Sequence, residues 1–129
     1  MAKTRVLIID DDRELAGELQ GALLFKGYDA DCCTDERQAR LRARLFKPDV
    51  ILLDLRMPVK SGFKVAQELR DGGDAAGIPI IGMTGVANGG EAQRLMGRLG
   101  FADCLLKPFF PLDIITKIEL ALARRTAPG

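Results

Sequence analysis

The stretch Asp49-Val50-Ile51-Leu52-Leu53-Asp54-Leu55-Arg56-Met57-Pro58 decides the fold of this chain. Its apolar residues, 50–53, show no alternation, and a proline follows soon after, a pattern that favours a strand buried on both faces of a parallel sheet. Open sheets of this kind bind ligands at the carboxyl ends of their strands. Asp54 is therefore expected at the edge of the sheet where such a site would form.

The composition indicates one globular domain without a bias toward any charged partner. The chain has 129 residues, 47% of them hydrophobic and 29% charged, and single domains cluster at roughly 100 to 150 residues. The 19 Lys and Arg residues nearly balance the 18 Asp and Glu residues, so no overall field attracts nucleic acid or an anionic membrane. No apolar stretch approaches the ~20 residues of a membrane span, and the start of the chain is unlike a signal peptide. We therefore expect a cytoplasmic protein that neither enters a membrane nor binds nucleic acid directly.

Histidine and cysteine usage excludes several kinds of catalytic site. The chain has no histidine, which removes histidine acid–base catalysis and the commonest metal ligand. Its three cysteines show no C-x-x-C spacing, so neither a zinc site nor a disulfide framework is indicated. Two of them, Cys32 and Cys33, are adjacent, and we expect reduced, partly buried thiols.

Strand-like and helix-like segments alternate five times along the chain. The expected strands lie at Val6–Ile9, Tyr28–Cys32, 50–54, Ile78–Met83 and Cys104–Leu106. The expected helices cover Arg13–Lys26, Thr34–Phe46, a stretch that Ser61 caps, Asn88–Leu99 and a stretch that begins at Pro111. This alternation predicts an α/β fold, a doubly wound five-stranded parallel sheet with helices on both faces.

The apolar residues of the helices predict which faces pack on the sheet. Asp12 is the expected cap of the first helix, and Gly27 the residue that ends it. The predicted inner positions are Leu15, Leu19, Ala22 and Leu23 in the first helix, Ala39, Leu41 and Leu45 in the second, Phe63, Val65, Ala66 and Leu69 in the third, and Leu112, Ile115, Ile118 and Leu122 in the last, with Ile114 on its flank.

Polar side chains follow four of the expected strands. Asp10 and Asp11 follow the first strand, Asp54 ends the third, Thr84 the fourth, and Lys107 the fifth. Parallel strands end at the same edge, so these groups can converge. Carboxylates in one pocket repel each other by about 4 kcal/mol per pair at close range. A divalent cation offsets that repulsion, and Mg²⁺ suits a site with few carboxylates and room for phosphate.

These residue types are sufficient for phosphoryl transfer. A carboxylate can attack phosphorus to give an aspartyl phosphate, while Lys107 supplies positive charge and Thr84 a hydroxyl donor. Taken singly, each residue is explained as a helix cap or a loop residue. The combination at four separate strand ends is much more specific.

The sequence resembles the receiver domains of two-component response regulators. The motifs that carry the resemblance are Ile8-Ile9-Asp10-Asp11-Asp12, Leu53-Asp54-Leu55-Arg56-Met57-Pro58 with Gly62 following, Met83-Thr84-Gly85 and Leu106-Lys107-Pro108-Phe109. They lie within a match from about Val6 to Leu122, nearly the whole chain. The resemblance implies a receiver domain over residues 1–125, followed by a frayed tail at 126–129.

The resemblance also implies roles for individual residues. Asp54 would be the phosphoacceptor. Mg²⁺ would be held by Asp10, Asp11, Asp54 and the backbone carbonyl of Arg56. The phosphoryl-binding and switch residues would be Thr84, Gly85 and Lys107. The Lys107–Pro108 bond would be cis, and the sheet would have the flavodoxin-like strand order 2-1-3-4-5.

One position departs from the family pattern. Family members often carry Tyr or Phe three residues before the lysine, with a ring that changes rotamer when the threonine moves, and here this position is Cys104. We therefore expect activation to run through the glycine-rich fourth helix, with phosphorylation ordering residues Val86 to Gly97.

The function that the resemblance implies is signalling. The domain would accept a phosphoryl group from a histidine kinase or a histidine phosphotransfer protein and present a changed surface to a downstream protein target. It would catalyse only its own phosphorylation and dephosphorylation, and so would not be an enzyme in the usual sense. A homodimer through the fourth and fifth helices is an assembly that the resemblance allows.

Two alternatives remain open from the sequence. A magnesium phosphatase of the haloacid dehalogenase type also uses Asp-x-Asp after a first strand, and Asp10 and Asp12 fit that spacing, although Asp54 would then have no role. The other alternative is a receiver-like module that binds partners without being phosphorylated.

Overall fold

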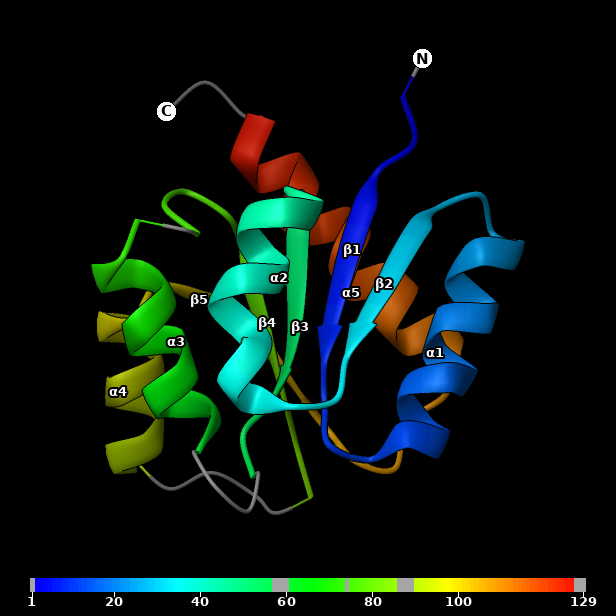
Figure 1. The fold of residues 1–129 in the computed structure, drawn as a ribbon. Helices are drawn as coiled ribbons and strands as arrows, with labels where there is room; N and C mark the ends of the chain where they lie inside the picture. The colour runs from blue at the N-terminus through cyan, green and yellow to red at the C-terminus, as the bar shows by residue number, and fades with distance from the viewer. Residues whose placement is uncertain (1, 57–60, 74, 86–89, 127–129) are drawn as a thin grey trace.

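The fold is a five-stranded parallel sheet between two layers of helices (Figure 1). The structure, a computed structural model, describes residues 2–56, 61–73, 75–85 and 90–126. Its elements are β1 (Arg5–Ile9), α1 (Arg13–Phe25), β2 (Asp29–Cys33), a 3₁₀ turn η1 (Glu36–Gln38), α2 (Ala39–Phe46), β3 (Val50–Asp54), α3 (Gly62–Asp71), β4 (Ile80–Thr84), α4 (Gly90–Arg98), β5 (Phe101–Leu106) and α5 (Pro111–Thr126). The strand order is β2-β1-β3-β4-β5. The predicted fold class and the predicted strand order, which places the second strand at an edge of the sheet, are confirmed.

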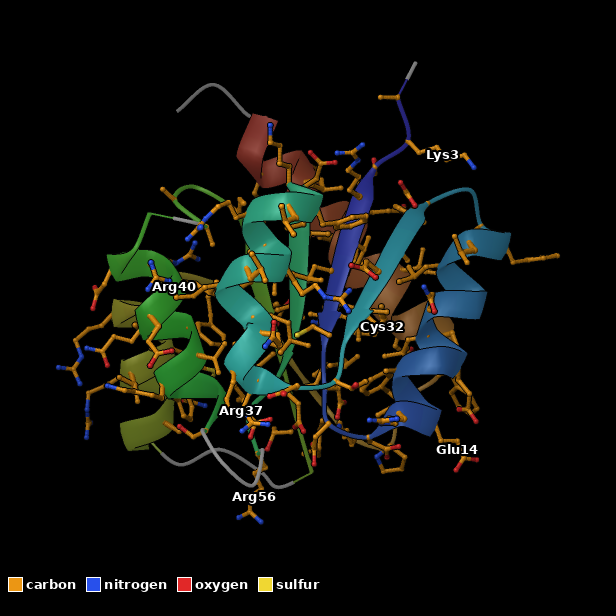
Figure 2. All side chains as sticks on the ribbon, in the orientation of Figure 1. Lys3, Glu14, Cys32, Arg37, Arg40 and Arg56 are labelled. Carbon is orange, nitrogen blue, oxygen red and sulfur yellow. The ribbon has the colours of Figure 1, made fainter. Side chains whose placement is uncertain are left out.

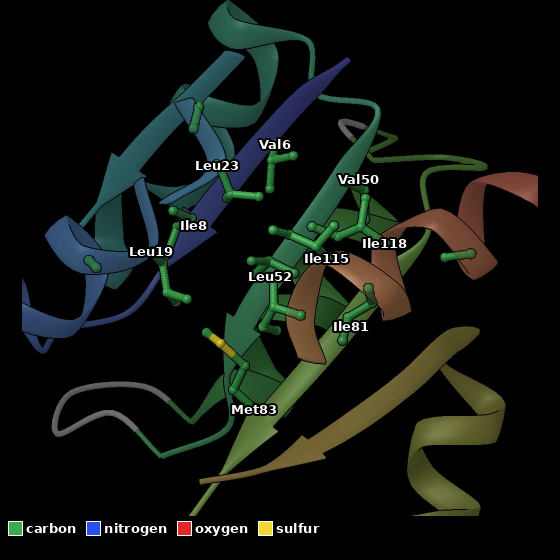
Figure 3. Packing of buried hydrophobic residues seen from close by; sticks show 14 residues of the cluster. Val6, Ile8, Leu19, Leu23, Val50, Leu52, Ile81, Met83, Ile115 and Ile118 are labelled. Carbon is green, nitrogen blue, oxygen red and sulfur yellow. The ribbon is translucent and has the colours of Figure 1, made fainter. Parts of the chain in front are cut away.

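The sheet divides the core into two apolar layers. One layer, drawn in Figure 3, joins alternate residues of the sheet to α1 and α5 through Leu19, Leu23, Ile115 and Ile118. The other joins the remaining sheet residues to α2 and α3 through Ala39, Ala43, Val65 and Leu69. Every residue of β3 is buried, as expected for a central strand covered on both faces. The sequence pattern that led to Asp54 is thus explained by the position of β3 in the sheet.

All five strands point the same way, so their carboxyl ends form one edge (Figure 1). The first and last described residues lie at the opposite edge. Helix caps turn the chain at the carboxyl edge. The Asp12 side chain accepts a hydrogen bond from the Leu15 N–H and starts α1, and the Ser61 hydroxyl accepts one from the Lys64 N–H and starts α3. Both caps are where the sequence predicts them.

Three predicted inner positions are wrong. Leu41 and Leu45 of α2 are 45% and 70% exposed, and Leu112 of α5 is 63% exposed. In α2 the side chains that face the sheet are those of Ala39 and Ala43. Because these side chains are small, the backbone of α2 can lie close to the sheet. In α5 the inner face is formed by Ile114, Ile115, Ile118 and Ala121, so Ile114 lies inside rather than on the flank.

Several element boundaries also differ from the prediction. Strand β4 begins at Ile80, and Pro79 lies before it, with its carbonyl accepting from the Ile51 N–H. Strand β5 begins at Phe101 rather than Cys104, with a register shift between Ile80 and Ile81 on its neighbour. A 3₁₀ turn capped by Asp35 precedes α2 where the sequence suggested one helix from Thr34. The predictions for 57–60, 86–89 and 127–129 lie outside the described residues.

Arg70 ties three segments of the chain together from the end of α3. Its guanidinium donates hydrogen bonds of 2.5 to 3.2 Å to four backbone carbonyls, those of Ala75, Ile78, Leu99 and Gly100. Burial lowers the pKa of this guanidinium. The carbonyls belong to the approach to β4 and to the connection between α4 and β5, so one side chain fixes both connections to α3.

The thiols of β2 are held in the fold. Cys32 and Cys33 point to opposite faces of the sheet, and their Sγ atoms donate to the carbonyls of Ala16 and Asp35. Burial is the main cause of a raised pKa for both thiols, which disfavours the reactive thiolate.

Within the residues that the structure describes, no helix combines the length and apolar character that a membrane crossing requires.

Candidate functional site

The acidic residues predicted from the strand ends lie together at the carboxyl edge of the sheet. Asp10 follows β1, Asp54 ends the neighbouring β3, and Asp11 follows Asp10. One carboxylate oxygen from each lies within 4.8 Å of the others. Asp10 and Asp54 are buried while Asp11 is exposed. The cluster therefore reaches solvent through Asp11.

Asp54 is an unusual carboxylate because it is almost fully buried, with 4% of its surface exposed. Its pKa is raised from 3.8 to about 6, first by burial and then by the neighbouring Asp10 charge. The Arg56 N–H, which donates to Asp54 Oδ1 at 3.1 Å, and the nearby Lys107 ammonium act in the opposite direction. A positive charge added beside Asp54 would therefore favour the ionised form of its carboxyl group.

Lys107 places a positive charge beside two of the three carboxylates. Its Nζ lies 3.0 Å from Asp10 Oδ2 and 3.6 Å from Asp54 Oδ1. Burial lowers the pKa of Lys107, but the hydrogen bonds and charges of Asp10 and Asp54 outweigh it, so the pKa stands above its ordinary value. The Lys107–Pro108 peptide bond is cis, the geometry that the resemblance implies.

The end of β4 lies beside Lys107 at the same edge of the sheet. Thr84 is buried there, Gly85 beside it is exposed, and the Thr84 carbonyl accepts a 2.6 Å hydrogen bond from the backbone N–H of Lys107. Cys104 lies on β5 opposite Gly82 of β4 and is partly buried. Arg56 points its exposed side chain away from the fold at the same edge (Figure 2).

Gly62 has a structural role that residue types alone did not reveal. A Cβ atom on this residue would lie 2.2 Å from the carbonyl oxygen of Asp54 and 2.7 Å from Leu55 Cα. The first turn of α3 therefore rests directly on the backbone of Asp54. The only signal in the sequence is a glycine directly after a helix-capping serine.

Asp12, by contrast, is not part of the acidic cluster. Its side chain caps α1, and its N–H donates to Asp10 Oδ1 at 3.0 Å. The Asp10–Asp12 pair thus does not supply two converging carboxylates, which argues against the phosphatase alternative.

The arrangement suits a hard divalent cation and an anionic group. Three carboxylates, two of them buried, gather around one point with one ammonium beside them. Oxygen ligands of this kind are those that Mg²⁺ prefers. Three carboxylates against one ammonium leave negative charge that a cation would offset, so the donor set fits a bound cation.

In the metal-free protein, replacing Asp54 by asparagine should raise the stability at neutral pH. The folded-state pKa of about 6 lies above the ordinary 3.8, so the folded state binds more protons between these values and wild-type stability falls as the pH rises through them. The free energy of unfolding of Asp54→Asn should exceed that of wild type by about 2 to 3 kcal/mol above that window and by little below it. Urea unfolding with a chelator on both sides of the window measures this. An equal difference at both pH values would contradict a buried-charge origin.

Comparison with known proteins places the chain in a family. A family model described as the response regulator receiver domain matches residues 6–119. The chain is 35% identical over 125 residues to the response regulator MprA of Mycolicibacterium vanbaalenii, covering 96% of this chain and 52% of that protein. It is 34% identical over 130 residues to the phosphate regulon transcriptional regulatory protein PhoB of Pseudomonas aeruginosa, covering 100% and 56%. The chain thus spans about half the length of these relatives.

A solved structure agrees with this placement. The chemotaxis protein CheY4 of Vibrio cholerae superposes with a TM-score of 0.87 at 27% identity, covering 93% of this chain and 99% of that one. The fold, the match over residues 6–119 and the curated relatives together show that this chain belongs to the response regulator receiver domains, signalling modules of two-component systems.

Proposed function

We propose that this receiver domain accepts a phosphoryl group on Asp54, in a Mg²⁺-dependent reaction with a histidine kinase or a histidine phosphotransfer protein. The observation that carries the proposal is the position of the Asp54 carboxylate. It is buried beside Asp10 and Asp11, within 3.6 Å of an ammonium, and at the open edge of the sheet. Asp54 therefore combines burial, two neighbouring carboxylates that could share a cation with it, and an ammonium that could pair with a phosphoryl oxygen.

The proposed step forms a bond between Asp54 and phosphorus. An Asp54 oxygen attacks the phosphorus of a phosphohistidine, the phosphorus–nitrogen bond breaks, and the imidazole leaves with the electron pair and takes up a proton. Lys107, freed from its contact with Asp54, pairs with a phosphoryl oxygen. Thr84 and Gly85 line the same edge and supply a hydroxyl and open space for the group.

The cation would be held by Asp10, Asp11, Asp54 and the backbone carbonyl of Arg56. It would neutralise charge between the carboxylates and the incoming phosphoryl group. Asp10 also keeps Lys107 in place through their 3.0 Å contact. The residues of this chain thus orient and stabilise, while the partner supplies the phosphoryl group.

Phosphodonor labelling tests the proposal. Wild-type protein incubated with a small phosphodonor and Mg²⁺ should gain one phosphoryl group by intact mass, and Asp54→Asn should gain none. Asp71→Asn, at an exposed position in α3, is the matched control and should label like wild type. Labelling of Asp54→Asn, or no labelling of wild type, would contradict the proposal. The second result would support the module that acts without phosphorylation.

We further propose that phosphorylation changes the surface that a downstream protein reads, in the cytoplasm where kinase and target would meet. With Cys104 in place of an aromatic ring, the fourth helix is the proposed route, and a homodimer through α4 and α5 is one proposed form of the output. Helix α4 supports this route because it contains Gly90 and Gly97, which lower helix stability.

A further inference from the structure

A groove runs between α3 and α4, the two helices that lie side by side in Figure 1. Its volume is about 430 Å³, and its lining comes from the outer faces of both helices: Ser61, Phe63, Lys64 and Gln67 of α3 and its cap, and Leu95, Arg98 and Leu99 in and after α4. The phosphorylation site does not include any of these residues.

The floor of the groove is apolar and firmly packed. The Phe63 ring rests on the Phe101 ring of β5, with centroids 6.1 Å apart and a tilt of 38°. Leu95 and Leu99 are partly buried beside it. An apolar side chain that entered the groove would therefore meet a preformed surface rather than a flexible one.

The rim of the groove is cationic. It carries Lys64 from α3 and Arg98 from α4, and Arg94 extends it into an adjoining hollow of about 580 Å³ that Arg98 also lines. Among the residues that the structure describes, no carboxylate is recorded as a partner of these three side chains. Elsewhere, cations such as Arg42 and Lys117 pair with carboxylates of this chain.

Both walls of the groove are anchored to the rest of the domain. Helix α3 starts on the backbone of Asp54 through Gly62, and the end of α4 is held by the bonds from Arg70 to the carbonyls of Leu99 and Gly100. The groove is therefore a defined feature whose α3 wall begins at Asp54.

We propose that this groove binds an acidic segment of a partner protein, with an apolar side chain on the Phe63 floor and flanking Asp or Glu side chains on Lys64, Arg94 and Arg98. Carboxylates of a partner would pair with these three cations, for which the described part of the chain shows no acidic partner. The apolar floor is recessed, so it suits a side chain rather than a flat membrane surface. The Phe63 ring packs at a tilt against Phe101, so it is not free to stack on a nucleotide base from that side. The inference deepens the proposed function by naming a partner surface, and it does not require phosphorylation.

A labelled peptide tests the groove directly. The probe is a short fluorescent peptide with a leucine and a phenylalanine flanked on both sides by glutamates, titrated with the unphosphorylated full chain and followed by anisotropy. We expect saturable binding that weakens with added salt. The double variant Lys64→Glu with Arg98→Glu should weaken it by about tenfold or more. Leu95→Ala should weaken it without changing the salt dependence.

Matched controls separate the groove from general charge attraction. Lys3→Glu makes the same kind of charge change at the opposite edge of the sheet (Figure 2) and should bind like wild type. A peptide with alanines in place of the leucine and phenylalanine should bind at least about tenfold more weakly. Amide chemical shifts should move in 61–67 and 95–99 of the wild type.

Several results would overturn the inference: no binding, equal binding of the alanine peptide, equal loss with Lys3→Glu, shifts confined to other helices, or stronger binding of single-stranded oligonucleotide or anionic vesicles. Because the titration uses unmodified protein, its failure leaves the Asp54 labelling result untouched. Failure of labelling would likewise leave the titration valid.

Discussion

Replacing Gly62 by alanine should destabilise the domain by about 3 kcal/mol, at the upper end of the cost of overpacking. The added methyl group would lie 2.2 Å from the Asp54 carbonyl oxygen and 2.9 Å from the Asp54 carbonyl carbon. These are backbone atoms, so no side-chain rotation can make room. Either α3 must lift from the sheet or the end of β3 must move, and both changes disturb the surroundings of Asp54. We therefore expect the variant to lose phosphoryl labelling as well as stability.

Gly97→Ala is the matched control for this prediction. Gly97 lies in α4, and a Cβ there would have no close contact within 4 Å beyond its chain neighbours and the backbone of its own helix. Alanine should therefore raise the stability by up to ~1 kcal/mol through helix propensity alone. Urea unfolding of both variants measures the difference. A Gly62→Ala protein as stable as wild type would show that the start of α3 is not fixed by its contact with Asp54.

Replacing Arg70 by methionine should cost about 3 kcal/mol, because several charge-assisted hydrogen bonds are lost together. Methionine keeps the aliphatic part of the side chain, but the carbonyls of Ala75, Ile78, Leu99 and Gly100 lose their donor. The connections before β4 and β5 should then exchange their amide protons faster than the rest of the domain.

Arg37→Met provides the comparison for Arg70. Arg37 makes two hydrogen bonds to the Asp35 carboxylate, but both groups lie at the surface. Exposed ion pairs contribute little to stability, so the free energy of unfolding of Arg37→Met should stay close to that of wild type. Urea unfolding and hydrogen exchange of the two variants decide the point. If Arg70→Met and Arg37→Met behave alike, the carbonyl contacts of Arg70 do not hold the connections.

The sheet could be predicted from the sequence because each strand carries its own signal. The unbroken apolar run of β3 shows burial on both faces, and the alternation at 28–32 shows an edge strand. The acidic cluster was predictable for a related reason. Parallel strands end at one edge, so polar residues after β1 and β3 must meet there.

Other features depend on contacts between distant parts of the chain, and local patterns do not encode them. Leu41 looked like a core residue until the small Ala39 and Ala43 proved to face the sheet. Arg70 is one of several arginines in the sequence, and nothing near it indicates four carbonyl partners up to 30 positions away. The role of Gly62 could not be predicted from the sequence, because it depends on the position of the Asp54 carbonyl group in the fold.

The two ends of the described chain lie at the edge of the sheet opposite Asp54 (Figure 1). A fluorescent protein, affinity tag or surface tether joined at either end would therefore stand a full strand length away from the acidic cluster. Its bulk would not block a kinase approaching that cluster. Surface-immobilised kinetics and fusion reporters can thus be built on this domain with the acidic cluster facing solvent.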